Sequence, residues 1–389
     1  MGRRDDFYRV MNHQQPERLV IDFGGCPQTS MDGKSHAMLL DYLGYGPVAD
    51  EERLPFGRAR KIDERVLELF DTDTRSVGTI LRPRESLYRE ISENEYIDEW
   101  GIRRVFTGLY WDIVDYPLKG AAVRDLKNYR FPDPRSVDPQ EIERYASEAR
   151  RLFEETDYIV CAEHPVYGVF ELGCWLCSFD DFLLKMALDE EFVNMLFEII
   201  LEYQKQVIDV YYGALGRHIH YTSSGDDFAT QSSLFVSPEM FRALVKPYLK
   251  ERISYTKQYT DAAYLHHSCG SVFPIVDDLI DCGVEILNPI QPKAKNMDPA
   301  ALKEAYGDRI VFHGGIDTQE ILPFGTRDEI ESCVRDTISV LNSDGGYIFA
   351  AAHNIQEDVP PENLAFMLET ARRQAPSGWT EGRDRGIKK

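Results

Sequence analysis

Two imidazoles and one thiol lie within four positions of the stretch YLHHSCGSV, at His266, His267 and Cys269. The stretch runs from an apolar segment into a glycine, a pattern typical of the end of a β-strand. Side chains two apart on a strand face the same side, so we expect His267 and Cys269 to point together and His266 to point away. Imidazole and thiolate both bind zinc, and this pair would supply half of a tetrahedral site. The alternative is a hydrogen-bonded core histidine beside a cysteine that only fills space.

A catalytic zinc ion takes three protein ligands and leaves one position open for substrate. His353, in GGYIFAAAHN, also ends a strand-like run and is our candidate for the third ligand. Further polar side chains follow other strand-like runs, where carboxylates and imidazoles can move protons or grip a substrate. They are the candidate catalytic residues Asp226, Asp227 and His313, and the candidate substrate-binding residues Glu163, His164, Gln291, Asp317 and Asn354.

Asp226 and Asp227 are adjacent, and neighbours on a strand face opposite sides, so only one is expected to enter a site. The alternative role for these carboxylates is to cap the next helix. His313 precedes two glycines, which indicates a close approach of the backbone at that point. It either orients a substrate or lines the mouth of the fold structurally.

Strand-like runs alternate with longer helical patterns along the whole chain, which indicates a parallel sheet with crossover helices. About eight such runs are present, so we predict one α/β domain over residues 1–389, a (β/α)8 TIM barrel, with its site at the carboxyl ends of the strands. An open doubly wound sheet is the alternative, although no GxGxxG motif follows the first run. The runs are 18–25, 73–80, 157–168, 217–227, 262–270, 284–292, 309–317 and 345–354.

One segment departs from this alternation. Residues from about 86 to 134 show short alternating runs and few helical stretches, so we predict a β-rich insertion after the second strand. It is a candidate cap for the barrel mouth or a candidate contact surface of a homodimer.

Composition excludes several classes of partner. The 389 residues include 44 basic and 66 acidic side chains, a formal net charge of −22, which disfavours nucleic acid and anionic membranes. No apolar run approaches the roughly 20 residues of a membrane span. The first residues contain no apolar signal region, and the seven cysteines suit a reducing compartment, so we expect a cytoplasmic protein.

Several stretches together resemble the uroporphyrinogen decarboxylase superfamily, from about Phe7 to Arg373. They are HHSCGSV, GVEILNPIQ, FHGGIDTQEILPFGT, GGYIFAAAHNIQEDVPPENL and GDDFATQSSLFVSPEMFRALVKPYLK. The resemblance implies a TIM barrel and one of two activities. One branch removes carboxylates from porphyrinogens without a cofactor, and the other consists of zinc-binding, cobamide-dependent methyltransferases.

The resemblance bears differently on the two branches. Decarboxylases hold their substrate with an arginine-rich loop after the first strand, whereas GGCPQTSMDGKSH has Lys34 as its only permanent cation. The decarboxylase aspartate and histidine correspond to Asp73 and His353. In the methyltransferase pattern, His267 and Cys269 match the first two zinc ligands, and His353 stands where the third is a cysteine.

We therefore expect an enzyme: a zinc-dependent methyltransferase that moves a methyl group between a small methylated compound or thiol and the corrinoid of a partner protein. Zn2+ would be held by His267, Cys269 and His353. The alternative is a cofactor-free decarboxylase of the porphyrin-biosynthetic type. A third hypothesis, from a different functional class, is a non-catalytic barrel that binds a small ligand.

Overall fold

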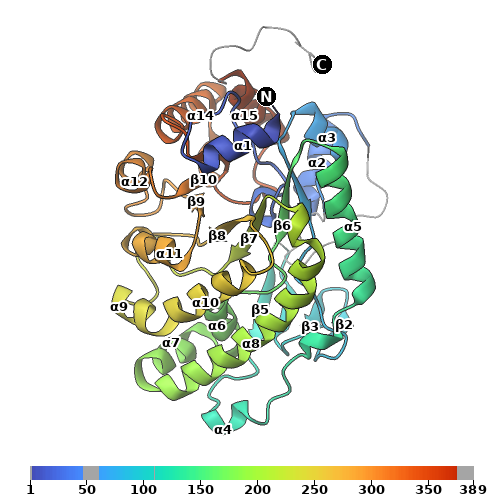
Figure 1. Cartoon of the computed structure of the whole chain (residues 1–389), viewed down its shortest axis with the longest axis vertical. Helices are drawn as coiled ribbons and strands as arrows, with labels where there is room; N and C mark the ends of the chain where they lie inside the picture. The colour runs from blue at the N-terminus through green and yellow to red at the C-terminus, as the bar shows by residue number, and fades with distance from the viewer. Residues whose placement is uncertain (1, 47–60, 109, 375–389) are drawn as a thin grey trace.

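The computed structural model of the chain describes residues 2–46, 61–108 and 110–374, and its centre is a curled parallel sheet wrapped by helices (Figure 1). The sheet has seven strands in the order β1-β6-β7-β8-β9-β10-β11, with every neighbouring pair parallel. The strands are β1 Thr74–Val77, β6 Ile159–Glu163, β7 Tyr221–Gly225, β8 Ala263–His267, β9 Ile286–Ile290, β10 Val311–Ile316 and β11 Tyr347–Ala351. Sequential order with a helix between neighbours is the pattern of a barrel-like α/β fold.

The first predicted strand, residues 18–25, forms only an isolated parallel bridge between Ile21 and Phe349 of β11. On its other side the Asp73 amide donates to the Ile21 carbonyl over 3.0 Å, so this short segment lies between the two edges of the sheet. The Ile21 amide donates to the Asp73 side chain rather than to a backbone carbonyl, and Gly24 turns the chain at φ +78°. Our expectation of about eight full strands is thus corrected to seven strands and one bridge.

Charged side chains fasten this closure at the amino ends of the strands. Asp73 pairs with Arg3 of the first helix and, over 2.8 Å, with Arg372 of the last helix. Arg372 also donates to the Leu19 carbonyl at 3.0 Å, and Arg18 reaches Asp71 at 2.8 Å. Both terminal helices are therefore tied to the same seam of the barrel.

Helices cover the outside of the sheet, and the longer ones bury apolar side chains. Several begin at side-chain caps that the sequence supplies, such as Asp138 before α5 and the Thr326–Glu329 capping box of α14. None of the helices in the described ranges is long and apolar enough to cross a membrane. The α-helices are α1 Arg3–Met11, α2 Gly33–Tyr42, α3 Glu64–Leu69, α4 Val123–Leu126, α5 Pro139–Glu155, α6 Val169–Cys177, α7 Phe179–Leu188, α8 Glu190–Leu215, α9 Pro238–Met240, α10 Lys246–Thr256, α11 Val276–Cys282, α12 Pro299–Tyr306, α13 Ile321–Phe324, α14 Arg327–Leu341 and α15 Pro361–Arg373.

The chain between β1 and β6 contains a second, antiparallel sheet of four short strands, within the segment expected to be β-rich. A buried ion pair holds it, because Asp98 accepts from Arg104 at 3.0 Å and from the amides of Trp100 and Ile102. Tyr110, beside its last strand, hydrogen-bonds Gln356 after β11, which brings this sheet to the carboxyl ends of the barrel strands. The strands are β2 Arg89–Ser92, β3 Glu95–Ile97, β4 Arg103–Phe106 and β5 Trp111–Asp115.

Candidate functional site

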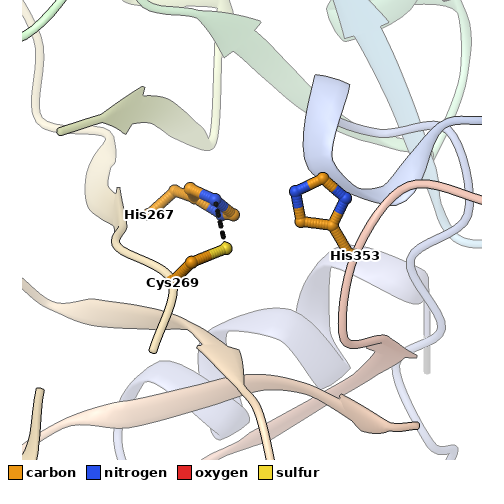
Figure 2. Close-up of side chains that lie close together, drawn as sticks. All are labelled: His267, Cys269 and His353. Atoms are coloured by element: carbon orange, nitrogen blue, oxygen red, sulfur yellow. Dashed lines mark hydrogen bonds between the residues drawn. The ribbon is translucent and has the colours of Figure 1, made fainter. Parts of the chain in front are cut away.

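The structure brings His267, Cys269 and His353 together at the carboxyl ends of β8 and β11. Their ligand atoms all lie within 4.8 Å of one another, and His267 Nε2 is 3.4 Å from Cys269 Sγ. Figure 2 shows His353 on the opposite side of a gap from this pair. The imidazole centroids of His267 and His353 are 5.6 Å apart. Two imidazoles and one thiol in this arrangement are a donor set that can hold a transition metal.

His266 points away from this group, as strand alternation requires. Its ring stacks on Phe228 with centroids 5.4 Å apart, and its Nδ1 lies 3.2 Å from Ser224 Oγ. Burial, reinforced by the Arg252 charge, lowers the pKa of His266 well below its usual value, so this imidazole stays neutral. The two neighbouring histidines therefore face different environments.

Asp226 and Asp227 also separate. Asp226 is buried and accepts from the amides of Phe170 at 3.1 Å and Glu171 at 2.7 Å, so it caps α6, the helix that follows β6. Gly168 makes this possible, because a Cβ there would meet Asp226 Cγ at 2.1 Å. Asp227 instead lines the site, accepts from the Cys269 amide at 2.7 Å, and lies 3.7 Å from His267 Nε2.

A pocket of about 270 Å³ opens beside the three clustered side chains. Its wall includes the predicted substrate-binding residues Glu163, His164 and Asn354 together with His267 and His353. Aromatic side chains complete it, from Tyr110, Tyr167 and Trp175. Burial, with help from Arg252, lowers the pKa of His164 well below its usual value. A neutral His164 can therefore accept or donate a hydrogen bond at the pocket wall.

Three other predicted residues lie outside the pocket lining. Gln291 accepts from the Gly270 amide at 2.9 Å and so fixes the turn after Cys269. Asp317 accepts from the amides of Glu320 and Ile321 and caps α13. Asp73 precedes β1 and pairs with arginines at the opposite end of the barrel, so it is not brought to the mouth.

His313 lies beneath the site, fully buried, rather than in the pocket. Its Nδ1 is 2.6 Å from Asn288 Nδ2, and its Nε2 is 2.8 Å from Asp22 Oδ2. Asn288 Oδ1 in turn is 2.5 Å from His267 Nδ1. The predicted catalytic histidine thus contacts the candidate ligand His267 only through Asn288.

Sequence reasoning missed Asp22 and Glu171 as site residues. The signal for Asp22 was a carboxylate inside the apolar run RLVIDF. Glu171, near the start of α6, lines the pocket, and burial together with the charges of Asp227 and Asp226 raises its pKa well above the usual range. No pattern in the sequence distinguished Glu171, because its position depends on how α6 packs across the mouth.

Comparisons with known proteins agree with this architecture. Residues 123–374 match the family described as uroporphyrinogen decarboxylase (URO-D). A uroporphyrinogen decarboxylase of Chlorobaculum tepidum is 23% identical over 143 residues, which is 36% of this chain and 39% of that protein. One from Legionella pneumophila is 34% identical over 83 residues, 20% of this chain and 22% of that protein. The alignments thus span well under half of these curated relatives.

A solved structure extends the likeness to the whole fold. A methyltransferase from Methanosarcina mazei superposes with a TM-score of 0.66 at 17% identity, covering 96% of this chain and 99% of that one. At this identity the likeness concerns the arrangement of the backbone.

Proposed function

Because the chain belongs to the uroporphyrinogen decarboxylase (URO-D) family, we propose that it is a zinc-dependent methyltransferase of that family. The observation that carries the proposal is the convergence of His267, Cys269 and His353 at the edge of a pocket, with ligand atoms within 4.8 Å of one another. The methyl group of a small methoxylated or methylated compound would pass to the corrinoid of a partner protein.

The donor set has the chemistry of a zinc site, and the His267–Cys269 pair also has the spacing. Bonds of about 2.0–2.3 Å to tetrahedral zinc place neighbouring ligand atoms roughly 3.3–3.8 Å apart, and the His267 Nε2 to Cys269 Sγ distance is 3.4 Å. Burial, with the Asp227 and Glu171 carboxylates, raises the pKa of the Cys269 thiol well above its usual value. A bound cation would reverse this effect and favour the thiolate.

Each nearby residue has a definite task in the proposed reaction. A zinc ion held there would act as a Lewis acid toward the heteroatom that loses the methyl group. Asp227 fixes the Cys269 backbone and is the carboxylate placed to hold or deliver the proton that this heteroatom needs. The aromatic wall of Tyr110, Tyr167 and Trp175 excludes water and packs against an apolar or aromatic substrate.

The pocket also favours this reaction over porphyrinogen decarboxylation. Within the described part of the chain, its lining contains no lysine or arginine, whereas Glu163, Glu171 and Asp227 supply carboxyl groups. A substrate with several carboxylates would lose its water shell there without gaining a cationic partner. The alternative activity therefore lacks the electrostatic complement that its substrate needs.

Metal analysis of purified protein tests the proposal. Protein prepared without chelator should contain about one zinc per chain, and Cys269→Ser should lose most of it. His266→Ala is the matched control and should retain the metal, because that imidazole faces Phe228. Reduced cobalamin can replace the corrinoid protein, and its conversion to methylcobalamin with methoxylated aromatic compounds is followed by absorbance. Full activity in metal-free protein would refute the zinc assignment.

A separate assay addresses the alternative. Uroporphyrinogen incubated with the protein should lose carboxylates no faster than in a blank, because of the acidic pocket. Formation of coproporphyrinogen at an enzymatic rate would instead establish the decarboxylase.

A further inference from the structure

A chain of buried hydrogen bonds runs inward from His267 for two further side chains and ends on a carboxylate. His267 Nδ1 meets Asn288 Oδ1 at 2.5 Å, Asn288 Nδ2 meets His313 Nδ1 at 2.6 Å, and His313 Nε2 meets Asp22 Oδ2 at 2.8 Å. All four side chains are buried, and they come from β8, β9, β10 and the Ile21 bridge segment. We call these four residues the His267 relay.

Asp22 determines which atom carries the hydrogen in the innermost hydrogen bond of the relay. Burial alone would raise the pKa of Asp22, but the hydrogen bond and charge of His313, with hydrogen bonds from Thr74 and Tyr221, outweigh it and hold the pKa below its ordinary value. An ionised carboxylate can only accept, so His313 Nε2 must carry the hydrogen. Besides His313, its donors are the Gly25 amide at 2.8 Å, Thr29 Oγ1 at 3.0 Å, Thr74 Oγ1 at 2.7 Å, Tyr221 OH at 2.8 Å and, more distantly, Cys26 Sγ at 3.9 Å.

Asp22, Cys26 and His313 also form a group with the spacing of metal ligands. The hydrogen bonds of Asp22 favour a role as the fixed acceptor at the inner end of the His267 relay. Both carboxylate oxygens already accept hydrogen bonds from protein donors. Burial and the charge of Asp22 hold the pKa of the Cys26 thiol far above its ordinary value, so this sulfur stays protonated. The Asp22 carboxylate is therefore already engaged by protein donors.

The donor and the acceptor of each remaining hydrogen bond in the relay follow in turn, from His313 outward to His267. The Asn288 amide nitrogen lies 2.6 Å from His313 Nδ1, and an amide nitrogen can only donate, so this orientation of Asn288 requires His313 Nδ1 to be an acceptor with the ring hydrogen on Nε2. Asn288 must then turn its oxygen toward His267, so His267 Nδ1 carries the hydrogen. The lone pair of His267 is left on Nε2, the atom that lies 3.4 Å from Cys269 Sγ.

We propose that Asp22, His313 and Asn288 are positioning residues that hold His267 in the Nδ1–H tautomer, so that Nε2 is ready to bind a metal ion before the ion arrives. The inference deepens the proposed function, since it concerns the same zinc site. Hydrogen bonds to the second nitrogen of a metal-binding imidazole fix its ring and strengthen it as a ligand.

The opposite orientation of the Asn288 side-chain amide would give His267 the other tautomer. With the amide reversed, Asn288 would donate to His267 Nδ1 and accept from a doubly protonated His313. His267 would then carry its hydrogen on Nε2 and could not bind a metal there without losing it. The two orientations therefore differ in a measurable property of the metal-free protein.

The first experiment measures that tautomer directly. Metal-free full-length protein with 15N-labelled histidine is studied by NMR, and His267 is assigned from the spectrum of His267→Gln. We expect the Nδ1–H form of His267 in wild-type protein and a mixture of tautomers in Asn288→Leu. An Nε2–H form in wild-type protein would overturn the proposal.

The second experiment measures zinc affinity by competition with a chromophoric chelator. Asn288→Leu should weaken zinc binding by about 10–100-fold, the usual effect of removing such a partner. Asn288→Asp should recover part of that affinity, because a carboxylate also accepts from His267 Nδ1 although it cannot donate to His313 Nδ1. Tyr347→Phe is the matched control: it deletes a buried 2.6 Å hydrogen bond to the Gly314 carbonyl, next to His313 but outside the relay.

These readouts separate the relay from the proposed function. Equal zinc affinity in wild type, Asn288→Leu and Tyr347→Phe would overturn the relay even if the protein is a methyltransferase. If wild-type protein binds no zinc, the proposed function fails, and the tautomer of His267 still decides whether the relay exists. Thermal melting of each variant identifies any that does not fold, and Asn288→Asp then replaces Asn288→Leu in the NMR comparison, where it must keep the Nδ1–H form.

Discussion

Replacing His220 by asparagine should flatten the acid side of the protein's stability profile. His220 is 3% exposed at the amino end of β7, and its Nδ1 accepts from the Val160 amide at 3.0 Å. The ring packs against Phe153, with centroids 5.1 Å apart. Burial, with the Arg4 charge, lowers the pKa of His220 from its usual 6.5 to about 3. Asparagine keeps an acceptor for Val160 but cannot take up a proton.

The size of the effect follows from linkage between protonation and folding. The unfolded chain protonates His220 as the pH falls through 6.5, whereas the folded chain does so only near pH 3. Stability supplied by the neutral ring is therefore present above pH 6.5 and is lost progressively down to about pH 3. Between pH 7 and pH 5 the loss from this residue is about 2 kcal/mol.

Urea unfolding at pH 7 and pH 5 measures this loss. We expect the free energy of unfolding of wild-type protein to fall by about 2 kcal/mol more than that of His220→Asn over this interval. The lost ring packing lowers the stability of the variant at both pH values and cancels in the comparison. Equal losses in the two proteins would refute the reasoning, as would an imidazolium NMR signal from His220 in folded protein at pH 5.

Three further predictions concern other parts of the molecule. If His353 is a metal ligand, elemental analysis should find zinc retained in His353→Cys and lost in His353→Ala, and equal retention in both would remove it from the ligand set. Gly78→Ala should lower the free energy of unfolding by more than the roughly 1–2 kcal/mol that a left-handed backbone costs, because the new Cβ would lie 1.8 Å from Tyr211 Oη. Chemical denaturation should show a smaller loss of stability when the same substitution is made in Tyr211→Phe, and an equal loss would contradict the clash. Asp98→Ala should lower the free energy of unfolding by about 3–5 kcal/mol, because it removes the carboxylate that neutralises the Arg104 guanidinium in a buried ion pair; a loss under about 1 kcal/mol would show that water reaches this pair.

Local periodicity was enough to predict the parallel strands and the facing of His267 and Cys269. Alternation along a strand is a property of neighbouring residues, so HHSC sufficed to separate His266 from His267. The same reasoning predicted that Asp226 and Asp227 diverge. It could not predict that Asp226 would cap α6, because that contact joins residues 55 and 56 positions apart.

Contacts between distant parts of the chain account for the remaining differences. The His313–Asp22 bond spans 291 positions, so His313 looked like a mouth residue until the closure of the barrel placed Asp22 beneath it. The resemblance made Asp73 the counterpart of the decarboxylase aspartate, whereas it precedes β1 and pairs with arginines at the seam of the barrel. The apolar pattern of residues 18–25 predicted a regular first strand. It gave no sign that the Ile21 amide would donate to the Asp73 side chain instead of to a backbone carbonyl.

The seam of the barrel also sets an order for folding during synthesis. The partners that close it, Phe349 on β11 and Arg372 on α15, lie more than 270 positions after the Ile21 and Asp73 segments that they meet. A ribosome must therefore synthesise β11 and α15 before the barrel can close, and until then the Ile21 segment beside β1 lacks its partner on β11. Exposed strand edges are sites of aggregation, so a chain that stalls before β11 is the form most in need of chaperones.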